Sequence, residues 1–501
     1  MKHEKLSQAL NEVRDQYIEE AAKKKRRSYA PWVGAVAAVL ALVILAGIFL
    51  RPHSPQNPAV NLEAVPMETT PTETTPTEPA PVQLPPLSTD LRRFEIAKPI
   101  YPTMLNRPEN DFFDLDAYYA WRDNIKTLHN QPQSYGDGMQ NYFRTATPTI
   151  LADSDSTNPV CSPVNIYMAL SMLAEAADGE THKELLDFLG VETIEQLRLL
   201  NNYIWNGHYW DDGVTTSILG SSLWLDDQFT FNSECAEALA KYYYASSFSG
   251  DLGTEEMNKA LQNWLNEQTG GLLEEYANAV ELDPLTAFAL ASTIYYKVNW
   301  SSGFNEENNI EQTFYGKNED KNVTFMNKTI KGDTYFWSDN CGAVSLHLED
   351  GSNMWLILPD EGVDTNTVLQ SEDLWNMLFT QYKNQKQITV NLSIPKFKVD
   401  SSMELKELLG SMGLSNTMGT NADFSNLSPS ATFGVGSVTH AATVEIDEEG
   451  VAAAAFTVIP PPGAAPPTEY DEIDFVLDRP FIFIIESSDG LPLFAGVVNQ
   501  L

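Results

Sequence analysis

A run of twenty uncharged, mostly apolar residues near the N-terminus constrains this 501-residue chain more than any other feature. The run covers residues 31–50 and reads PWVGAVAAVLALVILAGIFL. As a helix, it would be about 30 Å long, which matches the hydrocarbon core of a bilayer. Basic residues cluster just before it at 23–27, and only Arg51 follows it directly. The positive-inside rule therefore predicts one transmembrane helix, with residues 1–30 in the cytoplasm and the rest outside the cell.

A cleaved signal peptide is the alternative interpretation of this run. The basic region before it would be 30 residues long and the apolar run itself is 20 residues long. Both are too long for a typical signal peptide. We therefore expect an uncleaved anchor in the cell membrane.

The chain after the apolar run divides into three further parts. Residues 51–87 form a predicted stalk, because the 52–86 stretch holds ten of the 29 prolines and repeats such as TTPTETTPTEP. Such a segment cannot bury enough apolar surface to fold. Residues 88–139 are richer in aromatic residues and are expected to pack on the body as an N-terminal extension. Residues 140–501 form the predicted globular domain.

Charge and composition exclude some functions. Asp and Glu number 69 against 31 Lys and Arg, giving a net charge of −38. A field of this sign repels phosphate backbones, so we expect no nucleic-acid partner. The hydrophobic share of 43% is sufficient for a buried core.

The sequence shows no catalytic or metal-binding motif. It has no G-x-S-x-G, H-E-x-x-H, P-loop or EF-hand pattern, so we expect no catalytic residue, metal or cofactor. The three cysteines lack the spacing of a zinc or redox motif, and an odd number excludes a complete disulfide framework. We expect three buried free thiols, at Cys161, Cys235 and Cys341.

The body has the pattern of an α+β domain. The segment 164–177 is a strongly apolar predicted helix, and Asp178 begins a second helix that ends at Gly190. Asp350-Gly351 marks a turn between two strands within 343–360. The other predicted elements are helices over 256–270 and 402–414, and strands over 289–300, 386–400, 439–450 and 479–500.

One stretch, 447–468, does not fit an ordinary element. It reads DEEGVAAAAFTVIPPPGAAPPT, with strand-like flanks, four alanines and a run of three prolines. Alanine favours a short helix, but the prolines forbid its continuation. Small residues after a glycine would also let this segment enter between two existing strands, and an exposed loop follows that could serve as bait for a protease.

The body resembles the serpins, which are protease inhibitors that act by conformational change. The resemblance covers residues 140–501 and rests on seven motifs in family order. These are NPVCSPVNIYMALSMLAEAADGET (158–181), LQNWLNEQTGGLLEEY (261–276), TIYYKVNWSSGF (293–304), LPDEG (358–362), SIPKFKV (393–399), SVTHAATVEIDEEGVAAAAFT (437–457) and RPFIFIIESSDGLPLFAGVV (479–498).

The resemblance implies a fold of three β-sheets and eight or nine helices, with an exposed reactive-centre loop. It also implies a mechanism in which a protease cleaves the loop and becomes acylated. The cut loop then inserts into the central sheet as a new strand, and the distorted protease cannot deacylate. The protein would be an inhibitor and not an enzyme.

The resemblance places the hinge of the loop at seven residues. Inward-facing positions alternate from Val451 and are small or β-branched, as burial beneath a sheet requires. The hinge residues are Glu449, Gly450, Val451, Ala452, Ala453, Ala454 and Ala455.

The family count from Gly450 places the cleaved bond at Ala464–Ala465. Small residues there suit an elastase-like or subtilisin-like endopeptidase. The loop is about five residues longer than is common, so the bond could lie anywhere from Gly463 to Tyr470. We expect the inhibitor to be a monomer.

Two departures from the family pattern affect the expected mechanism. Pro460, Pro461 and Pro462 lack the N–H of a central strand, so we expect insertion to stall late. In the sheet-opening region the hydroxyl and the amide are exchanged, which would preserve one hydrogen bond to the histidine. That region comprises Ser162, Asn165, Ser292, Trp300 and His440, with Trp300 expected to serve mainly in packing.

We therefore expect a membrane-tethered inhibitor of serine endopeptidases, or of cysteine endopeptidases. One alternative is a non-inhibitory serpin that serves as a binding module, which the proline run favours. The other is a transmembrane sensor whose residues 1–30 bind a cytoplasmic regulator.

Overall fold

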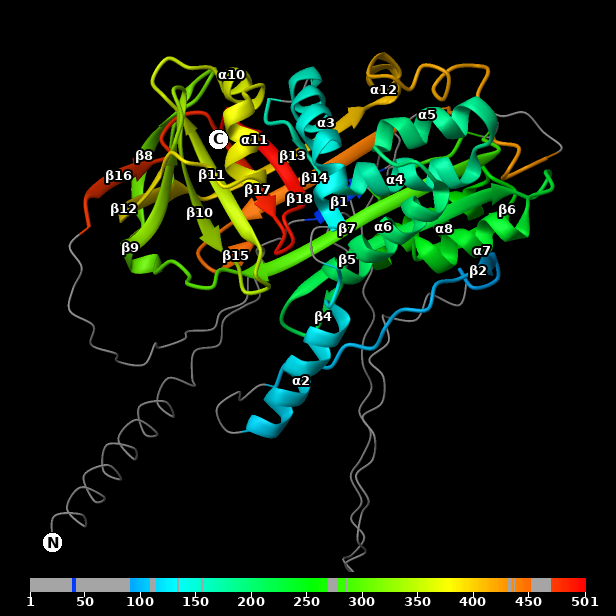
Figure 1. Cartoon of the computed structure of the whole chain (residues 1–501), viewed down its shortest axis with the longest axis horizontal. Coiled ribbons are helices and arrows are strands. Elements are labelled where there is room, and N and C mark those ends of the chain that lie inside the picture. The colour runs from blue at the N-terminus through cyan, green and yellow to red at the C-terminus, as the bar shows by residue number, and fades with distance from the viewer. Residues whose placement is uncertain are drawn as a thin grey trace, which may run out of the picture. The chain divides into compact units, whose positions relative to one another are not determined.

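The computed structural model describes most of the globular body and part of the chain before it (Figure 1). The predicted cytoplasmic segment 1–30 and the predicted stalk 51–87 lie outside the described residues. Those described are residues 38–41, 91–108, 114–132, 135–154, 157–268, 277–278, 280–283, 286–429, 434–436, 438–451 and 470–501.

The central sheet has nine strands among these residues. Its backbone order runs from β13 through β14 to a position shared by β15 and β1, then through β7, β5 and β6 to β2, while β4 pairs with β5. The bounds are β13 Phe397–Glu404, β14 Thr439–Ile446, β15 Gly450–Val451, β1 Ala38–Ala41, β7 Phe288–Asn299, β5 Thr216–Asp226, β6 Ala245–Gly250, β2 Glu95–Ala97 and β4 Trp210–Asp211.

A second sheet of nine strands packs beside the first. Its order is β16, β12, β9, β10, β11, β17, β18 and β3, with β8 paired to β9. The third sheet that the resemblance implies is continuous with this one, because β9 and β12 pair along their length. The bounds are β16 Glu472–Val476, β12 Gln385–Pro395, β9 Asp320–Trp337, β10 Cys341–His347, β11 Asn353–Pro359, β17 Phe481–Glu486, β18 Pro492–Val498, β3 Val160–Cys161 and β8 Ile310–Tyr315.

Several helices end at recognisable caps, whereas the helix predicted over 402–414 is confined to Lys406–Ser411, because residues 402–404 continue β13. The Ser162 hydroxyl caps α4 by accepting from the Asn165 N–H at 3.3 Å, and Gly190 ends α5 with a φ of 74°. The helices are α2 Leu115–Leu128, α3 Gln140–Asp153, α4 Pro163–Ala176, α5 Gly179–Leu189, α6 Ile194–His208, α7 Ser233–Tyr242, α8 Glu255–Gln268, α10 Thr365–Leu369, α11 Glu372–Phe379 and α12 Lys406–Ser411, with short 3₁₀ turns η1 Tyr135–Met139 and η2 Glu306–Asn308.

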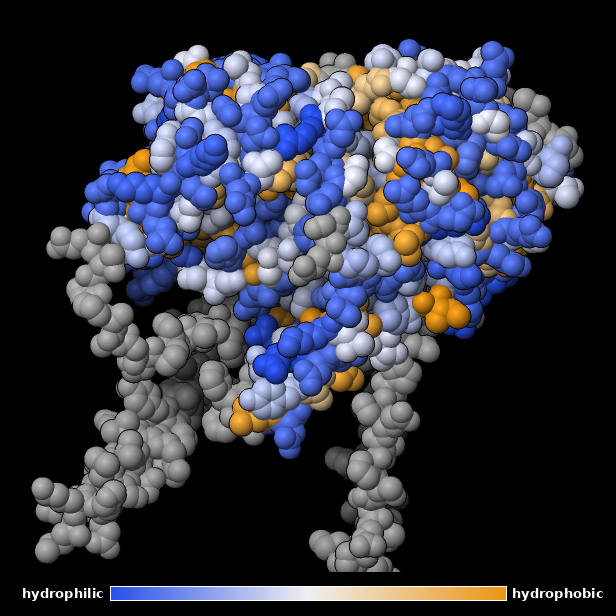
Figure 2. Space-filling model, viewed as in Figure 1, coloured by the Kyte–Doolittle hydropathy of each residue, from blue (hydrophilic) through white to orange (hydrophobic). Residues whose placement is uncertain are grey.

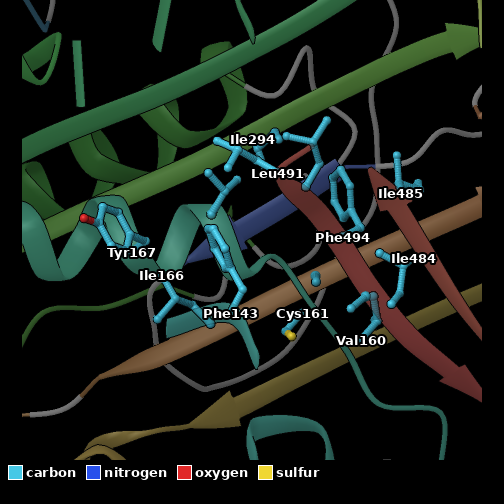
Figure 3. Packing of buried hydrophobic residues seen from close by; sticks show 14 of the residues in the cluster. Phe143, Val160, Cys161, Ile166, Tyr167, Ile294, Ile484, Ile485, Leu491 and Phe494 are labelled. Atoms are coloured by element: carbon cyan, nitrogen blue, oxygen red, sulfur yellow. The ribbon is translucent and has the colours of Figure 1, made fainter. Parts of the chain in front are cut away.

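The main core forms around α4, which is buried along nearly its whole length. Figure 3 shows Ile166 of α4 and Ile294 of β7 in the same packed region as Ile484 of β17 and Phe494 of β18. The three cysteines are buried and free, as the sequence predicted. The α+β expectation is confirmed.

Helices cover both faces of the central sheet. On β7, Ile294 belongs to the core cluster that contains α4, whereas Ala291 belongs to a second cluster that contains α8. Side chains an odd number of positions apart point to opposite faces of a strand. α4 and α8 therefore lie on opposite faces. The exterior view in Figure 2 is mainly hydrophilic, with apolar side chains gathered near α4 and α6.

Part of the N-terminal extension packs on the body. β2 pairs with β6 at the edge of the central sheet. The Tyr101 ring stacks on Trp205 of α6 with 5.0 Å between centroids, and Arg107 pairs with Glu349 at 3.2 Å. In contrast, α2 has no buried residue.

The apolar run 31–50 does not have the predicted conformation where it is described. Ala38–Ala41 form strand β1 and not a helix, because their backbone pairs with both β7 and β14. Among the described residues, no helix is both long enough and apolar enough to cross a membrane. The other residues of the run lie outside the described part of the chain.

Candidate functional site: the insertion slot between β7 and β14

The central sheet is divided at one place, between β7 and β14. Both strands pair antiparallel with β15 at one end and with β1 further along, so β7 and β14 run in the same direction (Figure 1). Here the insertion slot means the space between the facing edges of β7 and β14. Strand edges expose N–H and C=O groups that favour pairing with another strand. The slot therefore suits one antiparallel strand, and β15 and β1 each take part of this place in the structure.

β15 enters the upper end of the slot, and Gly450 and Val451 fit it closely. Val451 pairs with Ile446 on one side and Val298 on the other, and its side chain is fully buried. A Cβ at Gly450 would lie 2.6 Å from the Asn299 Cα and would clash with the Val298 carbonyl oxygen. Only glycine lets the backbone approach β7 this closely. β15 therefore occupies the first two positions between β7 and β14.

Trp300 holds the turn between β14 and β15. Its indole N–H donates to the Asp447 carbonyl at 2.9 Å, and its backbone N–H donates to the Glu449 carbonyl at 2.9 Å. The Asp447 carboxylate accepts from the N–H groups of Glu449 and Gly450 at 2.9 and 3.2 Å. Trp300 is therefore a hydrogen-bond donor to the hinge as well as the packing residue that the sequence suggested.

Glu448 links this turn to both sheets. Its buried carboxylate pairs with Lys396 Nζ at 2.5 Å and accepts from the Asn309 amide. Burial alone would raise the pKa of Glu448, but the hydrogen bonds from Lys396 and Asn309 lower it overall. By contrast, burial and the nearby charges of Asp447 and Glu306 raise the pKa of Glu449.

Below the hinge, His440 of β14 meets the start of α4. Its Nε2 accepts from the backbone N–H of Ser162 at 2.9 Å. This contact requires the neutral ring with the proton on Nδ1. Burial lowers the pKa of His440 to about 3. The Nδ1 atom has no hydrogen-bond partner among the described residues.

The exchanged pair, Asn165 and Ser292, forms a contact of its own. The Ser292 hydroxyl of β7 donates to the Asn165 side-chain oxygen of α4. The bond to His440 comes instead from Ser162. Ser292 and His440 both lie opposite Ala41, so β1 stands between them. The sheet-opening residues are therefore close together, but in two separate contacts.

The structure does not describe the remaining predicted site residues. Ala452–Ala455 of the hinge and the proposed cleavage site at Ala464 and Ala465 fall within 452–469, which lies outside the described residues. The described chain resumes at Tyr470, whose ring closely contacts Gly332.

Sequence reasoning missed two partners of the hinge, Lys396 and Asn309. Lys396 lies in the SIPKFKV motif, but the motif does not indicate a role for this lysine. A lysine between two strands gives no signal of its partner. The pairing depends on the fold that brings β12 and β14 to the same corner.

Comparisons with known proteins agree with this geometry. A family model described as "Serpin (serine protease inhibitor)" matches residues 142–501. An uncharacterized serpin-like protein of Thermococcus kodakarensis is 28% identical over 358 residues, covering 68% of this chain and 80% of that protein. The leukocyte elastase inhibitor of Xenopus laevis is 29% identical over 350 residues, covering 66% and 90%.

Solved structures show the same fold. The native state of the thermophilic serpin Tengpin superposes with a TM-score of 0.64 at 22% identity, covering 82% of this chain and 98% of that one. A native, stressed serpin of Arabidopsis superposes with a TM-score of 0.63 at 22% identity, covering 74% and 99%. These structures and this chain share one fold, a large mixed α/β domain. This chain belongs to the serpin family, whose members are in general protease inhibitors.

Replacing Lys396 with methionine should destabilise the protein by about 1–3 kcal/mol, because it leaves the Glu448 carboxylate buried without its cation. Urea unfolding measures the change. Lys398→Met is the matched control, since Lys398 is half exposed and lies 3.7 Å from Glu445. The control should cost less than about 1 kcal/mol. Equal losses in the two variants would contradict this account of the hinge.

His440 should make stability depend on pH. Its folded pKa of about 3 lies below the unfolded value of roughly 6.5. The unfolded chain therefore binds an extra proton in this window, and the free energy of unfolding falls as the pH is lowered from about 6.5 to 3. His440→Gln should reduce this slope by up to about 1.4 kcal/mol per pH unit. Urea unfolding at several pH values measures it.

The exposed His347 gives the control for this effect. His347→Gln makes the same substitution at an exposed position of β10, so it controls for the loss of a histidine as such. If His440→Gln and His347→Gln have the same pH dependence, the buried neutral ring is not what couples stability to pH.

Proposed function

We propose that this serpin is a suicide inhibitor of serine endopeptidases that traps its target by inserting the cut loop into the insertion slot. The observation that carries the proposal is the position of β15, where Gly450 and Val451 already pair with both edges of the slot. An inserted strand extends this pairing without changing its register. The same chemistry extends to cysteine endopeptidases, which also form acyl-enzymes.

The chain acts as a substrate first and as a trap afterwards. The protease serine attacks the loop carbonyl, so that the acyl-enzyme forms and the new amino end departs. Insertion then carries the attached protease along the sheet. Its oxyanion hole and nucleophile lose their geometry, and hydrolysis of the ester stops. The protein itself supplies no catalytic group.

The proposed cleavage site is Ala464–Ala465, within the range 463–470. Small residues suit an elastase-like or subtilisin-like target. The resemblance to a leukocyte elastase inhibitor supports this class. Tyr470 contacts Gly332 and directly precedes the body, which favours a bond upstream of it.

The hinge provides the sharpest test of insertion. Alternation from Val451 turns residue 453 into the core and residue 452 outward. Ala453→Arg should therefore be cleaved without forming a complex, because a buried unpaired charge blocks insertion. Ala452→Arg adds the same charge to the other face and should still trap the protease. Denaturing gels with an elastase-like protease show the covalent complex.

Two results would count against inhibition. One is a wild-type chain that is cut in the loop but forms no covalent complex, which favours a non-inhibitory binding or sensing module. The other is equal trapping by Ala453→Arg and Ala452→Arg, which would show that the hinge does not enter the sheet in the proposed register.

The proposal also tethers the inhibitor to the outer face of the cell membrane through residues 31–50. Their length, lack of charge and basic flank support it. A spanning helix and strand β1 use the same residues and exclude one another. In the tethered state β1 is absent from the slot, and the slot is free for the loop.

Leu40→Arg tests the tether, because an arginine near the centre of the span costs about 2.5–3.5 kcal/mol of insertion free energy. The variant should shift from the membrane fraction to the soluble fraction after cell lysis. His53→Arg, just beyond the run, is the control and should remain in the membrane fraction. A wild-type chain that is soluble from the start would overturn the tether and leave the inhibitor proposal standing.

A further inference from the structure

An apolar cavity lies at the lower end of the insertion slot, where β7 and β14 begin. Its volume is about 140 Å³. Leu170 and Leu173 of α4 line it on one face of the sheet, and Leu261 of α8 lines it on the other. The cavity therefore passes through the gap in the sheet. Its sides are formed by Phe288, Ala289, Leu290 and Ala291 of β7 and by Gly434, Val435, Gly436 and Val438.

The register of the slot fixes which loop residues would reach this cavity. Val451 lies opposite Val298 and Ile446. Continuing one residue per position places Ile459 opposite Leu290 and Val438. Strand β1 follows this register on both sides, since Ala38 lies opposite Tyr295 and Thr443, where residue 454 would lie. β1 ends at the position of residue 457, just above the cavity.

Residues 458–460 of an inserted strand would place apolar side chains in the cavity on both faces of the sheet. Residues an even number of positions apart share a face, so Ile459 points the same way as the buried Val451. Leu290 belongs to the packing of the α4 side, so Ile459 points toward Leu170 and Leu173. In the same register, residues 458 and 460 of an inserted strand would point toward α8 and Leu261. An apolar cavity of roughly this size stays dry and accepts an apolar group.

The proline run also fits the lower slot. β14 begins at Thr439, and the described residues before it, including Gly436 and Val438, are not in a strand. A strand residue directs its N–H to one neighbour and the next residue directs it to the other. One of Pro460 and Pro461 therefore faces a side without a ladder. Pro462 lies beyond Phe288, the first residue of β7. Full insertion thus loses at most one ladder hydrogen bond.

We infer that this cavity is the docking site for Ile459 and the prolines that follow it, so that the proline run completes insertion and does not stall it. The inference rests on the proposed inhibitory function. It reverses the expectation from sequence, where three prolines in a central strand predicted a late stop. The two expectations differ because the upper slot has a partner strand on each side, whereas the lower slot has one partner strand and an apolar cavity.

The test measures the stoichiometry of inhibition, which is the number of inhibitor molecules consumed per protease inactivated, with the full chain and an elastase-like protease. Ile459→Asp should raise it by roughly threefold or more, because the carboxylate would be buried without a partner. Thr468→Asp adds the same charge beyond the proposed bond and should leave it unchanged. The rate of loop cleavage, measured for both variants, separates recognition by the protease from insertion.

A second pair of variants tests the cavity from its wall. Ala169→Phe fills the cavity from α4 and should also raise the stoichiometry, while the melting temperature of the uncut variant shows that it folds. Ala120→Phe, on exposed α2, is the matched control and should behave as wild type.

Replacing the prolines distinguishes a proline run that completes insertion from one that stalls it. Replacing both Pro460 and Pro461 with alanine should change the stoichiometry by less than about twofold, since at most one ladder bond is restored. A large improvement would show that the prolines obstruct insertion and would overturn the inference. Wild-type stoichiometry in both Ile459→Asp and Ala169→Phe would overturn it as well. Failure of the proposed function is distinct, because wild type would then form no complex at all.

Discussion

The structure depends on the fact that β7 and β14 of the central sheet do not pair directly with each other. β7 and β14 run in the same direction, and among the described residues β15 and β1 are the strands between them. Their facing edges carry backbone groups whose best partner is another strand of the same chain. Gly450 and Val451 supply the first two positions of that strand. Beyond Val451, β1 occupies four positions between the two strands, and our proposal assigns these positions to the cut loop.

Two groups of contacts hold this arrangement at its ends. At the hinge, Trp300 and the Glu448–Lys396 pair fix the turn that leads into β15. Near the middle, α4 contacts β14 through Ser162 and His440, and contacts β7 through Asn165 and Ser292. One helix thus touches both sides of the slot. Separating β7 from β14 must strain or exchange these bonds, so in the proposed mechanism they contribute to the barrier to insertion.

Elements with local signals could be predicted from the sequence, and contacts between distant segments could not. The apolar segment 164–177, the helix start at Asp178, the stop at Gly190 and the turn at Asp350-Gly351 placed α4, α5 and the β10–β11 pair correctly. The Lys396–Glu448 pair joins residues far apart in the chain, and no spacing rule finds it. Residues 38–41 show another limit, because an apolar run suits a membrane helix and a buried strand equally well by composition. The effect of the prolines on insertion stays a prediction, and it depends on where β14 begins, which no local signal shows.

The central claim is that the intact fold is trapped short of its most stable arrangement. The most direct measurement is the melting temperature of the full chain before and after one cut within residues 452–469. The account predicts a rise of at least about 10 °C, as the cut loop becomes a new strand of the central sheet, which for a body of this size corresponds to several kcal/mol. An unchanged or lower melting temperature after the cut would contradict the account.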